Sequence, residues 1–251
     1  YKPRFSNSWD EYRNSIWHRV GYVNWGYEAI GRFQNWEQIA NYPIDNDRKG
    51  NRTVVPGDIM YKDQNNDGVI NYLDERPIGY RVDSTPTLNF GINLSASWKG
   101  FDLAMDWTCS CMTSWNQCYE TARPFQNDGN SPDEVLKDAW HLSDIWDANS
   151  PLIPGKYPMI RLNTDETSAY DKSSYWLHNV TYLKLRNLEV GYTFPKTWLN
   201  KTGISNLRLF VSGTNLLTLS NLSVMDPECA SDNGLDYPPM RVINIGVNLK
   251  F

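Results

Sequence analysis

Strict alternation of apolar and polar residues is the feature that most constrains the fold of this chain of 251 residues. The even positions of 88–98 are apolar, and the odd positions between them are Asn, Gly or Ser. The pattern resumes at 101–108 and returns at 243–251. Successive side chains of a β-strand point to opposite faces, so these runs predict strands with one apolar face and one polar face.

The spacing of the runs predicts how the strands connect. Lys99-Gly100 separates two alternating runs, which indicates a β-hairpin with a tight turn. Two further strands are expected at 180–194 and 206–219, and another within 20–33. Within 180–194 the apolar residues change from odd to even positions. We therefore expect a β-bulge near Arg186-Asn187, where one extra residue keeps the apolar side chains on the same face of the strand.

Long polar segments occupy 34–86, 109–174 and 220–239, and they contain at most short helices. If Lys99-Gly100 lies on one rim of the sheet, the connection 195–205 falls on that rim and all three long segments fall on the other. Short turns on one side and long loops on the other are typical of bacterial outer-membrane barrels. The fold class predicted is therefore all-β, an antiparallel transmembrane β-barrel segment with long extracellular loops.

A β-sandwich is the structural alternative, because its strands also alternate between a packed and a solvated face. Two observations favour the barrel: the polar face is small (Asn, Gly, Ser), and the rim asymmetry is extreme. In the barrel, Leu88, Phe90, Ile243 and Ile245 face lipid. The polar side chains expected to face plug or cargo are Asn89, Asn93, Asn244 and Asn248.

Composition excludes several classes of protein. The net charge of −5, with 21% charged residues, provides no basic field for nucleic acid. No run approaches the roughly 18 apolar residues of a membrane-spanning helix. The first residues, Tyr1 to Arg4, are neither a start Met nor a signal peptide, so we expect the chain to derive from a longer protein. The expected localisation is the outer membrane of a Gram-negative bacterium.

A series of ordered motifs resembles one family. They are Pro56-Gly57-Asp58-Ile59-Met60-Tyr61, Asn65-Asn66-Asp67-Gly68, Pro77-Ile78-Gly79, Thr85–Gly91, Trp98–Leu103, Tyr182–Leu188, Gly191–Pro195, Val211–Leu217 and Asn248–Phe251. Their order and spacing, from about Gly21 to the end, resemble the C-terminal third of the SusC/RagA family of TonB-linked outer-membrane transporters of Bacteroidota type.

The resemblance implies that 1–251 is the C-terminal portion of a 22-stranded barrel, a size known for such transporters. It implies an N-terminal plug and a TonB box that this chain lacks. It also implies a SusD-like surface lipoprotein as a lid. Such a protein imports glycans or peptides with TonB-delivered energy, is not an enzyme, and contacts outer-membrane lipid. The terminal Phe251 resembles the signal read by the barrel-assembly machinery.

One local motif predicts a metal site. The segment 63–74 has the D-x-N-x-D-G spacing of a calcium loop, and Ca²⁺ prefers six to eight oxygen ligands. Gly68 allows the sharp turn, and Glu75 is a substitute for the twelfth ligand. The predicted ligands are the side chains of Asp63, Asn65, Asp67 and Asp74 and the carbonyl of Val69. The alternative is a metal-free turn rich in Asn and Asp, which the same residues favour.

The sequence offers no catalytic motif, and no substrate-binding residue is assigned. Its three His are scattered, and it has no G-x-S-x-G elbow, P-loop or Rossmann fingerprint. The four Cys lack a C-x-x-C pair and are expected as isolated thiols or one incidental disulfide. The long segments also contain tryptophans that either stack on sugar rings, pack on the lid protein or anchor the loops. They are Trp115, Trp140, Trp146 and Trp176.

The main hypothesis is thus a SusC-like nutrient importer whose only cofactor is a structural Ca²⁺. The alternative from another class is a secreted, calcium-stabilised β-sandwich that binds carbohydrate. In the sandwich, Ile92 and Ile245 would pack against each other across two sheets.

Overall fold

The structure, a computed structural model, describes residues 23–80, 86–162, 167–200, 203–228, 234 and 236–251. These residues form two compact units, named here the sheet unit (within 86–113, 180–228 and 236–251) and the loop unit (within 23–80, 114–179 and 234). In the part of the chain that is described, no helix is long and apolar enough to cross a membrane.

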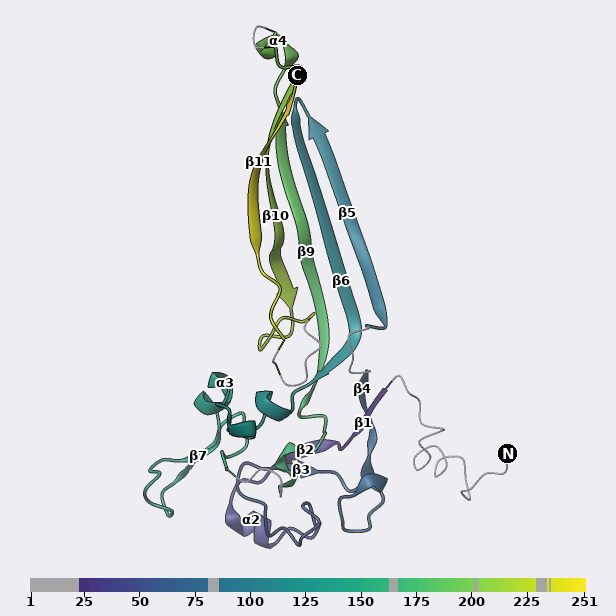
Figure 1. Ribbon diagram of the computed structural model, residues 1–251. Helices are drawn as coiled ribbons and strands as arrows, with labels where there is room; N and C mark the ends of the chain where they lie inside the picture. The colour runs from purple at the N-terminus through teal and green to yellow at the C-terminus, as the bar shows by residue number, and fades with distance from the viewer. Residues whose placement is uncertain (1–22, 81–85, 163–166, 201–202, 229–233, 235) are drawn as a thin grey trace, which may run out of the picture. The chain divides into compact units, whose positions relative to one another are not determined.

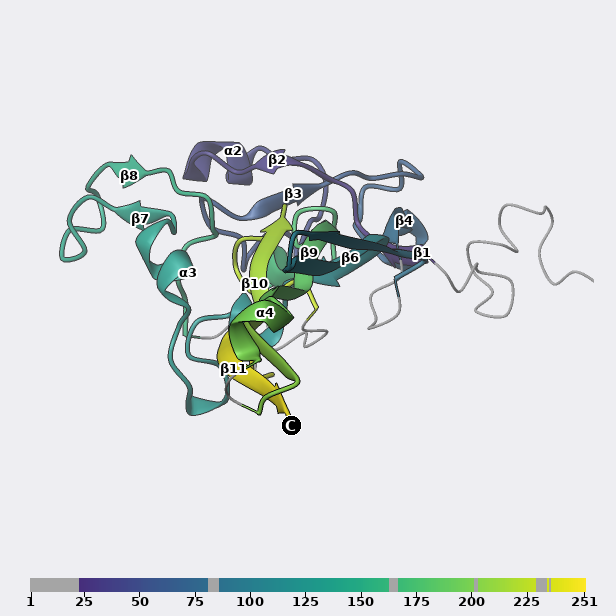
Figure 2. The ribbon, with the colours of Figure 1, turned by 90° about the horizontal axis from the view of Figure 1, so that it is seen from above.

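The sheet unit is built on five antiparallel strands in the order β11-β10-β9-β6-β5 (Figure 1). Seen along the strands, they form one layer (Figure 2). The strands are β5 (Leu88–Trp98), β6 (Phe101–Asn116), β9 (Leu177–Thr193), β10 (Asn206–Ser220) and β11 (Val242–Lys250). The predicted strands are therefore confirmed, with β6 eight residues longer than its alternating run: Cys109, Cys111 and Trp115 belong to the strand and not to a loop.

One end of the sheet unit contains only short connections. Lys99 and Gly100 both have positive φ (48° and 90°), as a two-residue type I′ turn requires. The amide of Thr193 donates to the carbonyl of Gly100 (2.7 Å), which places the next connection at the same end. That connection contains the short helix α4 (Lys196–Leu199). The long segments leave from the other ends of β6, β9 and β10, so the predicted rim asymmetry is confirmed.

The bulge expected near Arg186-Asn187 lies at that height, but the extra residue is in the partner strand. Thr214 pairs with Asn187 and Leu217 with Leu185, so β10 has two intervening residues where β9 has one. Asn215 within this bulge has φ 54°, a left-handed conformation that Asn tolerates better than most residues. The predicted bulge is thus present at this level of the sheet, in β10 and not in β9.

The strand predicted within 20–33 differs more. Its described part forms two short strands, β1 (Val23–Gly26) and β2 (Ala29–Arg32), which pair with β4 (Arg76–Tyr80) and β3 (Ile59–Tyr61) in separate two-stranded sheets. Neither joins the five-stranded sheet. Their side chains pack in the loop unit.

The loop unit has its own core, which the polar composition of its segments conceals. Its remaining elements are α2 (Trp36–Ala40), α3 (Asp133–Lys137), β7 (His141–Leu142), β8 (Leu152–Ile153) and single 3₁₀ turns at Tyr72–Asp74, Tyr119–Thr121, Gln126–Asp128 and Ser168–Tyr170. Tyr61 and Trp176 are buried at 0% and 1% exposure, and the ring of Trp176 stacks on Tyr170 at 5.6 Å. The long polar segments before β5 and between β6 and β9, expected to be loops, therefore fold into a unit with its own core.

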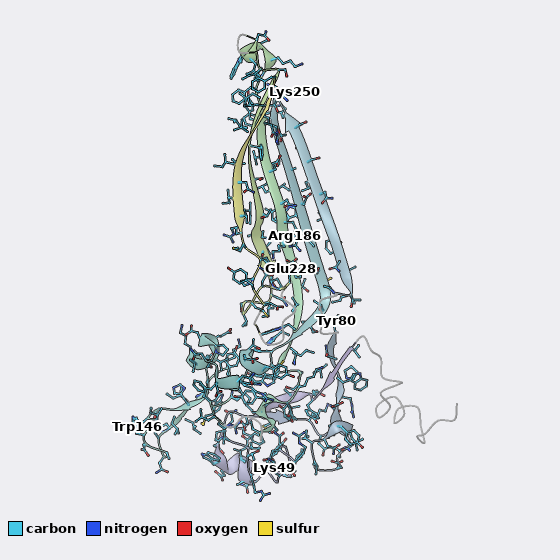
Figure 3. The ribbon with its side chains drawn as sticks, viewed as in Figure 1. Lys49, Tyr80, Trp146, Arg186, Glu228 and Lys250 are labelled. Atoms are coloured by element: carbon cyan, nitrogen blue, oxygen red, sulfur yellow. The ribbon has the colours of Figure 1, made fainter. Side chains whose placement is uncertain are left out.

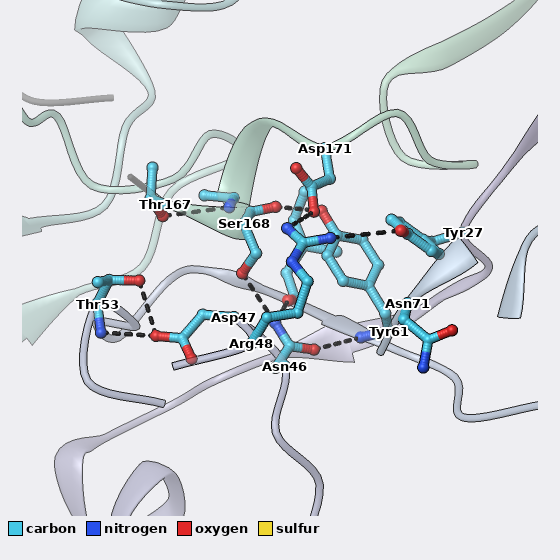
Figure 4. Close-up of polar contacts among 12 residues, drawn as sticks. Tyr27, Asn46, Asp47, Arg48, Thr53, Tyr61, Asn71, Thr167, Ser168 and Asp171 are labelled. Atoms are coloured by element: carbon cyan, nitrogen blue, oxygen red, sulfur yellow. Dashed lines mark hydrogen bonds and ion pairs between the residues drawn. The ribbon is translucent and has the colours of Figure 1, made fainter. Parts of the chain in front are cut away.

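A buried polar network joins distant parts of the loop unit (Figure 4). The fully buried Asn46 side chain accepts from the amide of Tyr61 (3.0 Å) and donates to the carbonyl of Ile59 (3.0 Å) and to Ser168 Oγ (3.2 Å). Tyr61 Oη donates to the carbonyl of Ser168 (2.7 Å). A buried amide with both ends bonded fixes the positions of its partners.

Asp47 organises the adjoining turn. Its carboxylate accepts from the amides of Lys49, Asn51 and Thr53 and from the hydroxyl of Thr53 at 2.7–2.8 Å. Burial acts to raise the pKa of Asp47, but these hydrogen bonds outweigh it and lower the pKa to about 2.

This shift predicts acid sensitivity of the turn. Because the folded pKa lies below the ordinary value, the stabilisation is present at neutral pH and is lost as pH falls from about 4 toward about 2. Asp47→Asn should remove this pH dependence and speed amide exchange in 47–53 at pH 6. Hydrogen exchange measured by mass spectrometry checks this, with the exposed Asp133→Asn as control. Equal exchange in Asp47→Asn and the parent protein would refute the role of the carboxylate.

Candidate functional site

The polar face of the five-stranded sheet contains an ion triad. Arg208 of β10 donates to both Asp102 of β6 and Glu189 of β9, with Nη2 2.6 Å from Glu189 Oε1 and Nε 3.1 Å from Asp102 Oδ1. Gly191 lies beneath the guanidinium, and a Cβ there would stand 2.4 Å from Arg208 Nη2. The absence of a side chain at Gly191 thus lets the triad lie flat on the sheet.

Further polar contacts extend along the same face. Asn187 Nδ2 donates to Asp106 Oδ2 (3.1 Å), and Ser110 bonds to the predicted Asn89. Asn93, Asn244 and Asn248 occupy the alternating positions that share this face. The face presents side-chain amides together with the charged side chains of Asp102, Asp106, Glu189, Arg208 and Lys250. It is suited to hydrogen bonding and not to packing in a core.

The opposite face is apolar, and no described residue covers it. Residues of β5 and β6 that pair directly lie together on this face. The pairs are Leu88 with Cys111, Phe90 with Cys109, Ile92 with Trp107 and Leu94 with Met105. Phe90, Ile92 and Leu94 are 44–49% exposed, and Ile245 is 82% exposed. Ile92 and Ile245 lie in strands at opposite edges of one sheet and do not pack across two. The sandwich alternative is therefore wrong for these strands.

At the end of the sheet unit away from the short turns, a buried cation anchors the segment after β10. Lys184 of β9 is 1% exposed, and its Nζ lies 3.0 Å from Asp226 Oδ2 and 2.8 Å from Glu228 Oε2. Arg186 also pairs with Glu228 (Figure 3). Asn221 donates its backbone amide to the carbonyl of Thr181 (3.3 Å), so the segment 221–228 is fixed along β9.

The predicted calcium loop is folded tightly on itself. Asp63 accepts from the amides of Asn66 and Gly68 (2.7 and 2.8 Å), and Asp67 accepts from the amide of Val69 (2.9 Å). Asn65 Nδ2 donates to Asp67 Oδ2 (2.8 Å). These Asx turns bring the side chains of Asp63, Asn65 and Asp67 onto one short loop. The hydrogen bonds of Asn65 and Val69 lower the pKa of Asp67, which is solvent-exposed.

Asp74 has a different position from the other predicted ligands. Its side chain is fully buried, and both its oxygens accept backbone amides, from Gln64 and Asn71 at 2.8 Å. It thereby closes the loop and caps the 3₁₀ turn Tyr72–Asp74. Asn71 Nδ2 donates to the predicted ligand carbonyl of Val69 (3.2 Å). Within the described ranges, no three His, Cys, Asp or Glu side chains are grouped as metal ligands; the calcium site stays a prediction.

The four loop tryptophans separate into two kinds. Trp115, Trp140 and Trp176 are buried, at 4%, 4% and 1% exposure, so they anchor the loop unit. Trp146 is 90% exposed, beside Ile145 at 73%, in the segment between β7 and β8. Trp146 is therefore the one of the four that is available to a partner or cargo.

The two remaining features predicted from the sequence are the terminal Phe251 and the cysteines. Phe251 follows β11 and is 84% exposed. Cys109, Cys111 and Cys118 form no disulfide with one another, and Cys229 lies outside the described residues.

Comparison with known proteins identifies relatives of this chain. No protein-family model matches the chain. The chain is 30% identical over 242 residues to TonB-dependent receptor P3 of Formosa agariphila, covering 89% of the chain and 22% of that receptor. It is 24% identical over 245 residues to TonB-dependent receptor SusC of Bacteroides thetaiotaomicron, covering 93% of the chain and 20% of SusC. The chain is a homologue of one stretch of these TonB-dependent receptors.

Solved structures of such receptors have the same fold. The RagAB peptide importer in its closed-closed state matches with a TM-score of 0.60 at 21% identity, over 91% of this chain and 23% of that one. A second structure of the RagAB peptide transporter matches with a TM-score of 0.58 at 22% identity, over 91% and 22%. This receptor chain thus spans about a fifth of the length of the relatives it matches.

Sequence reasoning missed several residues of this receptor segment. Lys184, Asp226 and Glu228 are brought together across more than 40 positions, and no local motif marks them. Arg208 and Asp102 could have been found, because both stand at polar positions of alternating strands near the same rim.

Removing the buried cation should release the 221–228 segment. Lys184→Met removes the cation that contacts both Asp226 and Glu228 and leaves Arg186 paired with Glu228. Breaking a buried pair costs about 3 kcal/mol. We expect faster hydrogen exchange at the amides of Asn221 and Glu228, measured in the full-length receptor. Lys196→Met, at an exposed position in α4, is the control. Unchanged exchange in 221–228 would show that Lys184 does not fix this segment.

Proposed function

We propose that this chain is the C-terminal barrel portion of a SusC-like importer in the outer membrane of a Gram-negative bacterium of Bacteroidota type. The observation that supports this most is the single-layer sheet with an apolar face that no described residue covers and a polar face of amides and ions. Hydrocarbon tails accept the first face, and the inside of a barrel accepts the second.

The remaining parts of such a machine lie outside this chain. A plug domain would contact the polar face, with its side-chain amides and its ion triad of Asp102, Glu189 and Arg208. TonB would supply energy through the N-terminal part. Transport would be mechanical and leave the cargo covalently unchanged. Phe251, exposed after the last strand, would be read by the assembly machinery.

A SusD-like surface lipoprotein is the proposed partner of the loop unit. The structural similarity to the RagAB peptide importer supports such a partnership. Trp146 and Ile145 supply an exposed apolar pair, and large aromatic side chains are enriched in protein interfaces. The cargo class is glycan or peptide.

We also propose that the 63–74 loop binds a structural Ca²⁺. The side chains of Asp63, Asn65 and Asp67 offer oxygens on one turn, and Gly68 has the positive φ of 83° that the turn needs. The ion would stiffen an extracellular segment.

Matched substitutions on the two faces of β5 test the membrane assignment. Ile92→Arg places a charge on the face proposed to contact lipid, which costs about 2–4 kcal/mol at the bilayer midplane. Asn93→Arg places the same charge on the polar face. Only Ile92→Arg should lower the amount of folded, heat-modifiable protein in detergent-extracted outer membranes. A protein that is extracted without detergent, or that tolerates both variants equally, would contradict the proposal.

Terbium luminescence tests the metal proposal. Extracellular calcium loops bind with dissociation constants of about 10⁻⁴–10⁻³ M. The full-length protein should bind Tb³⁺ competitively with Ca²⁺, and Asp67→Ala should weaken binding at least about tenfold because an exposed ligand is lost. Asp133→Ala, in α3, should bind as the parent does. No binding by the parent, or equal binding by Asp67→Ala, leaves the metal-free turn as the correct description.

A further inference from the structure

The connection between β10 and β11 turns back along β9 as soon as it leaves β10. The amide of Asn221 donates to the carbonyl of Thr181 (3.3 Å), and Asn221 Oδ1 accepts from the amide of Thr181 (2.9 Å). Farther along the connection, Glu228 pairs with Arg186 (Figure 3). The segment 221–228 therefore advances along β9 from Thr181 to Arg186, toward the short turns and not away from the sheet.

This segment lies on the polar side of the sheet. Successive side chains of β9 alternate between the two faces. Leu183 shares the apolar face with its partner Leu219, which is 52% exposed, so Lys184 points to the polar face. Lys184 Nζ lies 3.0 Å from Asp226 Oδ2 and 2.8 Å from Glu228 Oε2. The segment that supplies these two carboxylates is therefore on the polar side as well.

The segment closes this part of the polar face. Ser110 of β6 and Lys184 are each 1% exposed, and Tyr182 is 7% exposed. The hydroxyl of Tyr182 lies within hydrogen-bonding reach of both Ser110 and Glu228. Nearer the short turns the same face is open, and Asn187 is exposed. The carboxylates of the segment thus bond to polar groups that the sheet would otherwise present to water.

The bulge in β10 fastens the other end of the same connection. Arg186 Nη1 donates to Asn215 Oδ1 (3.4 Å), and Asn215 Nδ2 donates to the carbonyl of Met240 (3.1 Å), just before β11 begins. A bulge can redirect a side chain, and the left-handed backbone of Asn215 places its amide between these two groups. Arg186 therefore links Glu228, near the start of the connection, to the residue that holds its end.

The segment is stiff where it meets Lys184. Pro227 stands between the two carboxylates, and its ring restricts the backbone φ at that position. Asp226 Oδ1 accepts from the amide of Glu228 (3.0 Å), so the two residues are held in one turn. Charge-assisted hydrogen bonds to a buried ammonium then fix the direction of both carboxylates. These contacts describe a fixed element and not a lid that opens and closes.

We propose that the segment 221–228 is a strap folded into the interior of the barrel, where it covers the inner wall at β9 and occupies part of the passage. This rests on the proposed barrel, because the polar face becomes the inner face only when the sheet closes. The strap is thus not one of the extracellular loops expected from the sequence, and a surface lipoprotein does not reach it.

Cysteine labelling of the full-length receptor, purified in detergent, tests the position of the strap. In a background whose native cysteines are replaced by serine, the half-buried Met225→Cys is compared with Trp146→Cys, which is 90% exposed. A small sulfonated maleimide should label both thiols. A long poly(ethylene glycol) maleimide should label Met225→Cys at least about tenfold more slowly than Trp146→Cys, because thiol reactions depend on access.

Two results would overturn the proposal. Equal labelling of the two thiols by the long maleimide would place the segment outside the barrel, where it could meet a surface partner. A thiol at position 225 that neither maleimide labels would place the segment in a packed core and not in a passage.

Opening the clamp should expose the same position. Lys184→Met in the Met225→Cys receptor should raise labelling by the long maleimide toward the rate of Trp146→Cys, since the cation that holds both carboxylates is lost. Lys196→Met, in α4, should leave the rate unchanged. If Lys184→Met does not fold, Glu228→Gln opens the clamp at a half-buried position after β10. An unchanged rate in the folded variants would refute the clamp.

The outcomes separate the strap from the barrel. A full-length receptor that leaves the cell envelope without detergent refutes the barrel, and the strap with it. A receptor that needs detergent, and whose Met225→Cys reacts with the long maleimide as fast as Trp146→Cys, refutes the strap alone.

Discussion

The whole arrangement depends on one constraint, which is that a single-layer sheet must find a suitable environment for each of its two faces. Backbone hydrogen bonds between neighbouring strands satisfy the peptide groups within the layer. The side chains then divide by parity, with Leu, Ile, Phe and Trp on one side and Asn, Ser, Asp and Arg on the other. No second layer covers the apolar side in the described residues, so this side needs an environment that these residues do not supply.

The polar side shows how closely the sheet is adjusted to its own side chains. Gly191 makes room for the guanidinium of Arg208, and Gly246 makes room for Phe210, whose ring would stand 2.3 Å from a Cβ at that position. Arg208 in turn lies 5.1 Å from the ring centre of Phe210. Glycine in a strand interior weakens it, and these two positions regain contact by accepting a neighbour's side chain.

The sequence predicted the elements that are determined by a pattern of neighbouring residues. Alternation located β5 at both ends, because one of its faces is apolar throughout. It failed at Thr113, Ser114 and Trp115, where β6 continues with all three residues buried and the two-residue period disappears. The core of the loop unit was also missed. Its contacts join positions more than 100 apart, such as Tyr61 and Ser168, and aromatic residues without a period give no sign of it.

The same distinction applies to the candidate sites. The 63–74 loop was visible because its residues are contiguous and its turn chemistry is read directly from Asp, Asn and Gly. The cluster of Lys184, Asp226 and Glu228 was not, since its members come from segments more than 40 positions apart. An alternating strand predicts where a side chain points, but it does not predict what lies beside it.

The two outermost strands of the sheet have a consequence for handling the molecule. β5 and β11 each have one neighbour among the described strands, so a row of amide and carbonyl groups along their outer sides is available for pairing. Long, flat, apolar edges of this kind recruit further copies of themselves. Expressed by itself in water, this polypeptide is accordingly a candidate for fibrous self-association.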